Sequence, residues 1–471
     1  MKYAAALFFA LAVSARAQIA IPDTRPGAAL RAWLDAFNSG DHARVASYYD
    51  KYEPTHKDHT GSLLSFREQT GGFNLIRIEK SEPLHLEALV KEREGSNFAL
   101  LKLDMNDGDP PTVKQIAVHI VPAPPDQPKA ARLSFPEALK ALDTKATELA
   151  AQDKFAGAVL VARSDAIALE KAYGSADRTN HLSNTVDTEF HIGSMNKMFT
   201  ATAILQLVGE GKIDLAAPLG RYLPDYPNHD LATKVTIRHL LTHTGGTGDI
   251  FTPEFEAHRL ELRELADYLK LFGSRDLEFE PGSKWAYSNY GFILLGVVIE
   301  KISGVPYYDY VRKHVFEPAG MRATESLPET DSAPKRSLGY MRKNGAWVTN
   351  ADTLPWRGTS AGGGYSTVGD LFRFAQALSN GKLVNPDLFA QMTSKQASDP
   401  QMPPGAGYGF GMMVSEEPQG KRFGHGGGAP GMNAELRVYP RTRTVVVVLA
   451  NLDPPAATRL ADFFDERMPV D

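Results

Sequence analysis

A proline-rich segment divides this chain of 471 residues into two parts. Four prolines occur between residues 122 and 128, and proline favours stiff, extended backbone that takes no part in helix or sheet interiors. Because the chain is longer than one average domain, we expect a linker at residues 122–132. This linker separates a small N-terminal domain at 18–121 from a large domain at 133–471.

Charge and composition exclude several classes of protein. The chain carries 51 Lys and Arg against 56 Asp and Glu, a formal net charge of -5. It therefore has no basic field for a phosphate backbone, and we expect no nucleic-acid partner. Hydrophobic residues make up 43% of the chain, which is typical of a globular protein. The absence of cysteine excludes disulfides, thiolate metal sites and cysteine nucleophiles.

The first residues have the pattern of an export signal. Lys2 precedes an apolar run at residues 3–13, and Ala15 and Ala17 are small residues at the positions that a signal peptidase recognises. The run is about half of the roughly 20 residues that a membrane-spanning helix needs. We therefore expect a signal peptide at 1–17 that is cleaved, no integral membrane segment afterwards, and a periplasmic or secreted mature protein.

The N-terminal domain has a pattern of helices followed by a sheet. Apolar residues recur at helical spacing over residues 28–49, with a break at Ser39, Gly40 and Asp41. Alternating stretches predict strands of one antiparallel sheet at 75–78, 84–90, 98–103 and 113–121. The helix, short turn and paired aromatic residues over 33–49 resemble the opening of the NTF2-like α+β fold. The resemblance implies an accessory domain rather than a site of chemistry.

Ser194 and Lys197 lie in the most informative stretch of the large domain. An apolar run follows them to Val208, which predicts a buried helix with Ser194 at its N-terminus and Lys197 on the same face. A lysine in such an apolar setting loses stability as a cation, so it can act as the base that a weak serine nucleophile requires. Taken alone, the Ser-x-x-Lys pattern also fits a capping serine beside a surface lysine.

Two later segments carry further chemistry-bearing residues. Tyr287 and Asn289 form a Tyr-Ser-Asn triplet ahead of an apolar helix. Tyr287 can relay protons, and Asn289 can hold an amide or a lysine. His425 opens the glycine run that contains Gly427 and Gly428. Glycine there lets a substrate approach the backbone, whose N–H groups can receive an oxyanion.

The order and spacing of these elements resemble a known family. The chain has three short motifs in this order: Ser-x-x-Lys, Tyr-Ser-Asn and His-Gly-Gly, about 90 and then about 140 residues apart. They are similar to the three elements of the serine β-lactamase and penicillin-binding family. The class C-like branch contains class C β-lactamases, D-alanyl-D-alanine carboxypeptidases, D-aminopeptidases and family VIII carboxylesterases. Flanking stretches at 235–246, 360–367 and 449–451 resemble the same branch, and the similarity spans 135–464.

The resemblance implies both a fold and a mechanism. The implied fold is α/β (α+β): an antiparallel sheet flanked by helices, beside an all-helical lobe, with the site between them. Ser194 would be the nucleophile, Lys197 its activating group and Tyr287 the proton carrier between the serine and the leaving group. The reaction would pass through an acyl-serine intermediate and would need no cofactor.

The resemblance also assigns the substrate-binding residues. Asn289 would position the substrate amide, the N–H groups of Ser194 and Gly428 would form the oxyanion hole, and Gly427 belongs to the same element. His425 stands where class C β-lactamases commonly have a lysine whose ammonium attracts the carboxylate of a β-lactam. Histidine is largely neutral near pH 7, so the sequence favours a small-molecule or peptide substrate cleaved at a peptide, amide or ester bond.

Two alternatives to this function remain open. One is a true class C-like β-lactamase. The other is a penicillin-binding sensor or binding protein with little turnover. We expect the loops at 252–275 and 325–357 to determine substrate size and chemistry.

Other motif matches lack the context that their chemistry needs. Ser360 lies in a Gly-x-Ser-x-Gly match, but a nucleophile elbow requires a hydrophobic strand before it and a helix directly after it. Residues 426–431 match Gly-x-Gly-x-x-Gly, yet a strand-like run follows where a dinucleotide site needs a helix. We therefore expect neither motif to be functional.

The histidines do not predict a metal site. His239 and His243 are four residues apart, as zinc ligands on a helix can be, but the residues between them offer no general base. We expect no metal at this position, and the sequence carries no signal for an oligomeric state.

Overall fold

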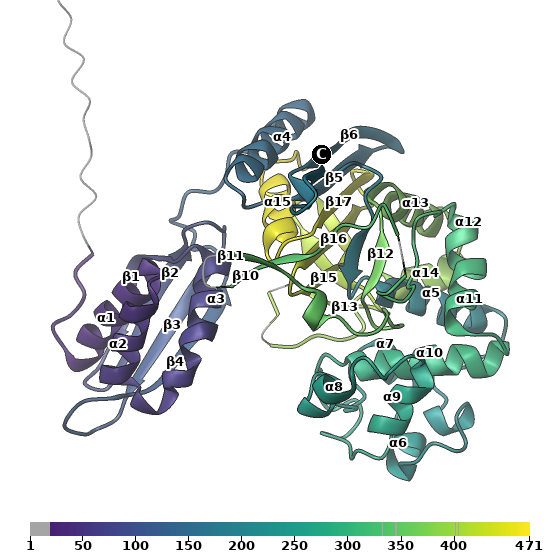
Figure 1. Cartoon of the computed structure of the whole chain (residues 1–471), viewed down its shortest axis with the longest axis horizontal. Coiled ribbons are helices and arrows are strands. Elements are labelled where there is room, and N and C mark those ends of the chain that lie inside the picture. Colours follow the sequence, from purple (N-terminus) through teal and green to yellow (C-terminus); the bar gives the residue numbers. More distant parts are fainter. Residues whose placement is uncertain (1–18, 332, 344–345, 401, 404) are drawn as a thin grey trace, which may run out of the picture. The chain divides into compact units, whose positions relative to one another are not determined.

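The computed structural model describes residues 19–331, 333–343, 346–400, 402–403 and 405–471. The chain separates into two compact units, and the second begins at Asp126, inside the proline-rich segment (Figure 1). The expected signal peptide at 1–17 lies outside the described residues.

The first unit packs helices against a four-stranded antiparallel sheet with the strand order β1-β2-β3-β4. Its elements are α1 (Arg25–Ser39), α2 (His42–Tyr52), a 3-10 turn (Pro54–His59), α3 (Thr60–Thr70), β1 (Phe73–Ser81), β2 (His85–Glu92), β3 (Phe98–Met105) and β4 (Val113–Val121). The sequence pattern did not predict α3. Leu63, Leu64 and Phe66 pack only partly buried against the core, so they form no clear apolar stripe.

Local sequence explains the ends of the first two helices. Gly40 ends α1 with a φ of 63°, which glycine adopts without steric cost. Asp41 then caps α2 by accepting a hydrogen bond from the N–H of Arg44. Between helix and sheet, the Trp33 and Phe37 rings stack at 4.6 Å. This unit is an α+β arrangement, and the NTF2-like resemblance stays a prediction.

The second unit is built on a seven-stranded sheet with the order β13-β14-β15-β16-β17-β5-β6, in which all neighbours are antiparallel. The strands are β5 (Gly157–Arg163), β6 (Ala166–Tyr173), β13 (Gly407–Tyr408), β14 (Met413–Glu417), β15 (Gly420–Ala429), β16 (Met432–Tyr439) and β17 (Thr444–Ala450). Every residue of β17 is buried, because helices cover both faces of the sheet at its centre.

Alternating side chains of the sheet divide the core into two layers. Val159 and Val448 face α4 (Phe135–Ala151) and α15 (Ala456–Asp465). Leu160 and Val447 face the opposite layer. That layer includes α5 (Asn196–Gly209) and α13 (Val368–Ser379). Figure 1 shows α4 and α15 on one side of the sheet and α13 on the other. The antiparallel sheet flanked by helices is thus confirmed.

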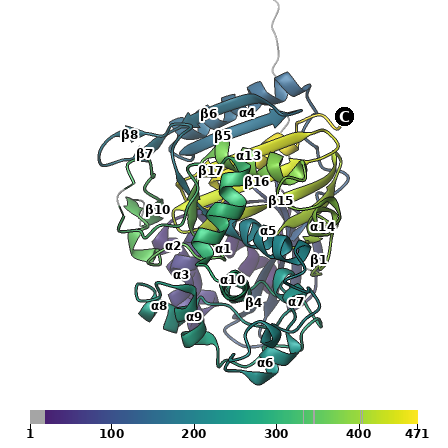
Figure 2. The same ribbon diagram turned by 90° about the vertical axis from the view of Figure 1, so that its right-hand side faces the viewer.

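A helical lobe is inserted between the N-terminal and C-terminal strands of this sheet (Figure 2). Its helices are α6 (His229–Lys234), α7 (Ile237–Leu241), α8 (Pro253–His258), α9 (Leu265–Phe272), α10 (Asn289–Ser303), α11 (Tyr307–Val311) and α12 (Glu317–Ala319), with a π-helical turn at Arg312–Phe316 and a 3-10 turn at Leu219–Arg221. The remaining elements are β7 (Ser175–Asp177), β8 (Leu182–Ser183), β9 (Phe190–Gly193), β10 (Tyr340–Lys343), β11 (Ala346–Thr349), a 3-10 turn (Ala351–Thr353), β12 (Gly364–Ser366) and α14 (Pro386–Met392).

In the part of the chain that the structure describes, no single helix meets the length and hydropathy needed to cross a membrane. One bent pair, Asn289–Ser303 with Tyr307–Ala319, meets these limits only when its two helices are taken together.

A buried arginine joins α15 to the sheet. Arg437 on β16 is 6% exposed and pairs with Glu435 at 3.2 Å, Asp462 at 2.8 Å and Asp465 at 2.6 Å. A buried guanidinium is tolerated because these carboxylates compensate its charge. Removing it would leave Glu435 and Asp462 without this cation, and Asp465 with Arg422 as its partner at 3.3 Å.

We expect Arg437→Ala to lower the free energy of unfolding of the second unit by about 3–5 kcal/mol, the cost of leaving buried partners uncompensated. Urea unfolding followed by circular dichroism measures the change. Lys234→Ala is the matched control, because its 2.8 Å pair with Asp230 is exposed and is expected to contribute less than about 1 kcal/mol. Equal effects of the two variants would contradict this role for Arg437.

Candidate active site

Ser194 lies in the turn between β9 and α5. The helix begins at Asn196, so Ser194 precedes it by two residues, and the N–H of Lys197 donates to the Ser194 carbonyl at 3.1 Å. Residues 191–200 are all buried except Ser194, which is partly exposed. The local fold therefore presents a single hydroxyl from an otherwise buried segment.

Lys197 reaches Ser194 from one turn into the helix. Its side chain is fully buried, and Nζ donates to Ser194 Oγ at 3.2 Å, to Asn289 Oδ1 at 2.7 Å and to the Ala361 carbonyl at 2.6 Å. Burial lowers the pKa of Lys197 to about 7, and the opposing charge of Asp249 limits that shift. An amine with this pKa is present in both protonation states near neutral pH.

Tyr287 completes the cluster around the hydroxyl. Its ring lies 4.6 Å from Lys197 Nζ, and its side chain hydrogen-bonds to Ser194. Burial raises the pKa of Tyr287, which the hydrogen bond to Ser194 partly offsets. The phenol is therefore protonated near neutral pH. The structure brings Ser194, Lys197, Tyr287 and Asn289 together.

Glycines allow β15 to approach the Ser194 turn. A Cβ on Gly427 would lie 1.9 Å from the Ile192 carbonyl oxygen, and one on Gly193 would lie 3.0 Å from the Gly428 nitrogen. Side chains at these positions would force the two segments apart. The close approach places the backbone of Gly427 and Gly428 beside the residue that precedes Ser194.

His425 is held as a neutral ring. Its Nδ1 lies 2.5 Å from the Gly426 carbonyl and therefore carries the hydrogen, while Nε2 accepts from the Tyr408 hydroxyl at 3.0 Å. Burial, with a smaller effect from the charge of Lys197, lowers the pKa of His425 to about 3. This position thus supplies no cation to the site near neutral pH.

His243 and Tyr408 contribute contacts that sequence analysis did not assign. The His243 ring packs 4.2 Å from the Tyr287 ring, and its Nδ1 accepts from the Ser288 N–H at 3.1 Å. Its carbonyl accepts from the Ala286 N–H at 2.9 Å. His243 therefore holds the backbone on both sides of Tyr287. Nothing in the local sequence predicts this contact, because the two segments meet only in the folded lobe.

The serine and the histidines of the other motif matches do not belong to the Ser194 cluster, although the Ala361 carbonyl within the Gly-x-Ser-x-Gly match accepts from Lys197. Ser360 is fully buried with no hydrogen-bond partner for its Oγ among the described residues, and it packs against Gly296 on α10. His239 Nδ1 accepts a hydrogen bond from the Thr236 N–H at the start of α7. Among the described residues, no group of three or more potential ligands is arranged to hold a metal ion.

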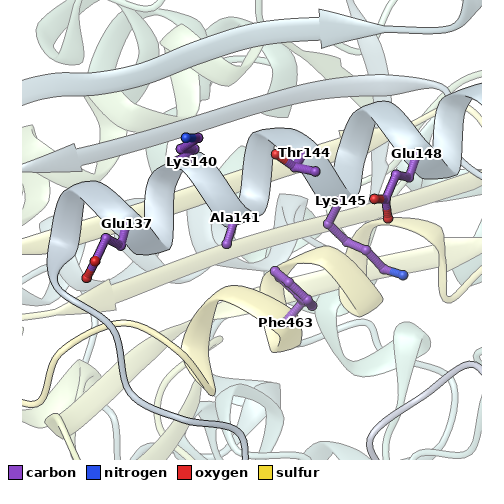
Figure 3. A pocket seen from close by; sticks show the side chains of 7 residues that line it. All are labelled: Glu137, Lys140, Ala141, Thr144, Lys145, Glu148 and Phe463. Atoms are coloured by element: carbon purple, nitrogen blue, oxygen red, sulfur yellow. The ribbon is translucent and has the colours of Figure 1, made fainter. Parts of the chain in front are cut away.

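A shallow pocket is also present on α4, away from these residues. It is lined by Glu137, Lys140, Ala141, Thr144, Lys145, Glu148 and Phe463 (Figure 3). Figure 3 shows the Lys145 side chain extending from the helix near Phe463, with Glu148 farther along the helix. None of these residues belongs to the Ser194 cluster.

Comparison with known proteins defines the family. The beta-lactamase family model matches residues 142–467. A penicillin-binding protein from Bacillus halodurans has 33% identity and a TM-score of 0.61, over 67% of this chain and 98% of its own. A D-stereospecific amidohydrolase from Streptomyces sp. has 30% identity and a TM-score of 0.59, over 68% and 97%. Esterase EstB of Burkholderia gladioli is 35% identical over 38% of this chain and 50% of its own.

The chain belongs to the beta-lactamase family. It is a serine hydrolase of that family.

We expect Gly427→Ala to lower kcat/KM about 100-fold or more, because the new methyl group collides with the Ile192 carbonyl and displaces the Ser194 turn. Hydrolysis of an activated ester measures the loss. Gly426→Ala on the same strand is the matched control, since its Cβ would lie 3.1 Å from Glu435 Oε1 and 3.5 Å from the Ala434 carbonyl oxygen, without the backbone collision of Gly427→Ala. Equal activity of both variants would contradict the close-approach argument.

Proposed function

We propose that this protein hydrolyses a peptide, amide or ester bond through an acyl intermediate on Ser194. The observation that carries the proposal is the contact of Lys197 Nζ with Ser194 Oγ at 3.2 Å, made by an amine whose pKa is about 7. Such an amine can accept the serine proton near neutral pH.

The hydrogen bonds of Lys197 explain how it acts as a base. The neutral amine has two N–H groups, which Asn289 Oδ1 and the Ala361 carbonyl accept. Its lone pair then faces Ser194 Oγ. As Oγ attacks the substrate carbonyl carbon, the serine proton moves to Lys197, and the oxyanion is received by the N–H groups of Ser194 and Gly428.

Tyr287 would deliver the proton to the leaving group. Its raised pKa keeps a hydrogen on the phenol, and its hydrogen bond to Ser194 places it beside the reacting atoms. When the tetrahedral intermediate collapses, the leaving nitrogen or oxygen takes the phenolic proton, and Lys197 returns its proton to Tyr287. Water then attacks the acyl-serine with the same groups acting in reverse, which releases the acid and restores Ser194.

The neutral state of His425 supports an amide or ester substrate over a β-lactam. A β-lactam carries a carboxylate that a fixed cation would attract, and the ring of His425 has a pKa of about 3. The amidohydrolase and esterase relatives are named for such substrates. The penicillin-binding relative makes penicillin recognition the second candidate.

We further propose that the chain is exported and cleaved after Ala17. The support is the sequence pattern of Lys2, the apolar run and the small residues before the cleavage position. N-terminal sequencing of protein from the culture medium and the periplasm tests this, with Gln18 as the expected first residue.

The nucleophile is tested by paired serine variants. We expect Ser194→Ala to abolish turnover of activated esters and D-amino amides, while Ser360→Ala keeps it, since Ser360 Oγ is buried against α10. Intact mass after brief exposure to a penicillin adds a second readout. A lasting Ser194-dependent adduct would indicate a sensor or carboxypeptidase, and rapid drug hydrolysis a β-lactamase. The reverse serine pattern would falsify the assignment.

The pH profile tests the base. Lys197 must be unprotonated to accept the serine proton, so we expect kcat/KM for an uncharged ester to rise with pH and reach half its plateau near pH 7. Stopped assays between pH 5 and 9 in buffers of constant ionic strength would locate the midpoint. A rate that is already constant at pH 5, or one that is still rising at pH 9, would show that another group is the base.

A further inference from the structure

Asp249 lies behind the candidate site, in the loop between α7 and α8. Its Oδ1 accepts from the backbone N–H of Asn289 at 3.1 Å and from Asn289 Nδ2 at 3.0 Å, and its Oδ2 accepts from the same Nδ2 at 3.1 Å. The loop is fixed in turn, since the Ile250 N–H donates to Oδ1 at 2.7 Å and Arg275 donates to the Asp249 carbonyl at 2.8 Å.

A carboxylate in this position decides which way the Asn289 amide points. Ionised carboxylate oxygens only accept hydrogen bonds, so the side of the amide that faces Asp249 must be the NH2 group. The carbonyl oxygen of Asn289 therefore points the other way, to Lys197 Nζ at 2.7 Å. With the opposite orientation, the amide oxygen would face the two carboxylate oxygens with no hydrogen between them, and NH2 would face the N–H groups of Lys197.

The same geometry engages only one of the two hydrogens of the Asn289 side-chain amide. The two oxygens of one carboxylate subtend a narrow angle at Nδ2, so a single N–H is shared between them. Asp249 therefore does not need the second amide hydrogen, which is the one that the predicted contact with a substrate carbonyl would use. The orientation of Asn289 thus serves both the lysine and the substrate contact expected from the sequence.

Asp249 also supplies the negative charge near the base. The titratable groups around Lys197 in the described structure are Asp249, Tyr287, His243 and His425. Burial raises the pKa of Tyr287 and lowers the pKa of both histidines, so these three groups are neutral near pH 7. Asp249 is the carboxylate of the set, and its charge raises the pKa of Lys197 against the larger effect of burial.

We propose that Asp249 is a positioning residue of this hydrolase: it orients the amide of Asn289 so that the carbonyl oxygen holds Lys197 against Ser194. The inference rests on the proposed function, because it assigns to Asp249 an effect on the base of that reaction.

Asp249→Asn tests the proposal with little change of shape. The new amide no longer forces the NH2 side of Asn289 toward itself, so we expect kcat/KM on the pH plateau to fall about 10- to 100-fold. Loss of the negative charge lowers the pKa of the ammonium, so the acidic limb should move to lower pH. A merely structural defect would lower activity without moving that limb. An unchanged rate or an unmoved limb would overturn the proposal.

A double-mutant cycle separates positioning from general damage. If Asp249 acts through Asn289, then Asp249→Asn should cause no further loss on the pH plateau in the Asn289→Ala background. Losses that add would overturn the proposal. Asp267→Asn is the matched control, because Asp267 also accepts backbone N–H groups in this lobe, at Arg263 and Glu264, and we expect its kcat/KM within about twofold of the unmodified protein.

Thermal unfolding of each variant identifies loss of fold, and the cycle is read at a temperature where all variants are folded. The Ser194→Ala variant is measured beside them. Turnover that persists in Ser194→Ala contradicts the proposed function itself, whereas its loss together with full activity in Asp249→Asn contradicts only the role of Asp249.

Discussion

The buried amine of Lys197 is the group in the second unit on which the arrangement of the site depends. An ammonium without exposed surface is costly unless acceptors surround it or it loses its proton. The acceptors come from three places: the Ser194 turn, Asn289 at the start of α10, and Ala361 in the loop before β12. Segments distant in sequence must therefore meet at one nitrogen. These acceptors do not fully offset the cost of burying the ammonium, and the pKa of Lys197 is lowered as a result.

Much of this arrangement could be predicted from sequence order. The helix that follows Ser194 and carries Lys197 is apolar on nearly all sides, which predicts burial of the amine. Tyr287 and Asn289 were found because they form a compact triplet ahead of another apolar helix. The strands β5 and β17 are nearly continuous apolar runs in the sequence, although nothing in them indicates that they pair.

The residues that sequence analysis missed act through contacts between segments. Asp249 and His243 resemble any loop aspartate and packed histidine until the fold brings them to the Tyr287–Asn289 segment. Tyr408 acquires its role only because His425 on β15 turns its Nε2 toward it. The neutral state of His425 follows from burial, which the sequence does not give for a histidine in a glycine-rich run. Helix α3 was missed for a simpler reason, because its apolar residues are only partly buried.

The pairing of β5 with β17 has a consequence for how the second unit forms. These strands are central neighbours in the sheet, yet the whole helical lobe and most of the other strands lie between them in the chain. The core layers on both sides of the sheet include residues from both strands. Such non-local pairing must wait for closure of a very long loop, which makes folding slow. A chain emerging from a ribosome or a membrane pore cannot complete this sheet until its C-terminal strands have also emerged. Until then the apolar residues of β5 lack their partner strand and are exposed to aggregation.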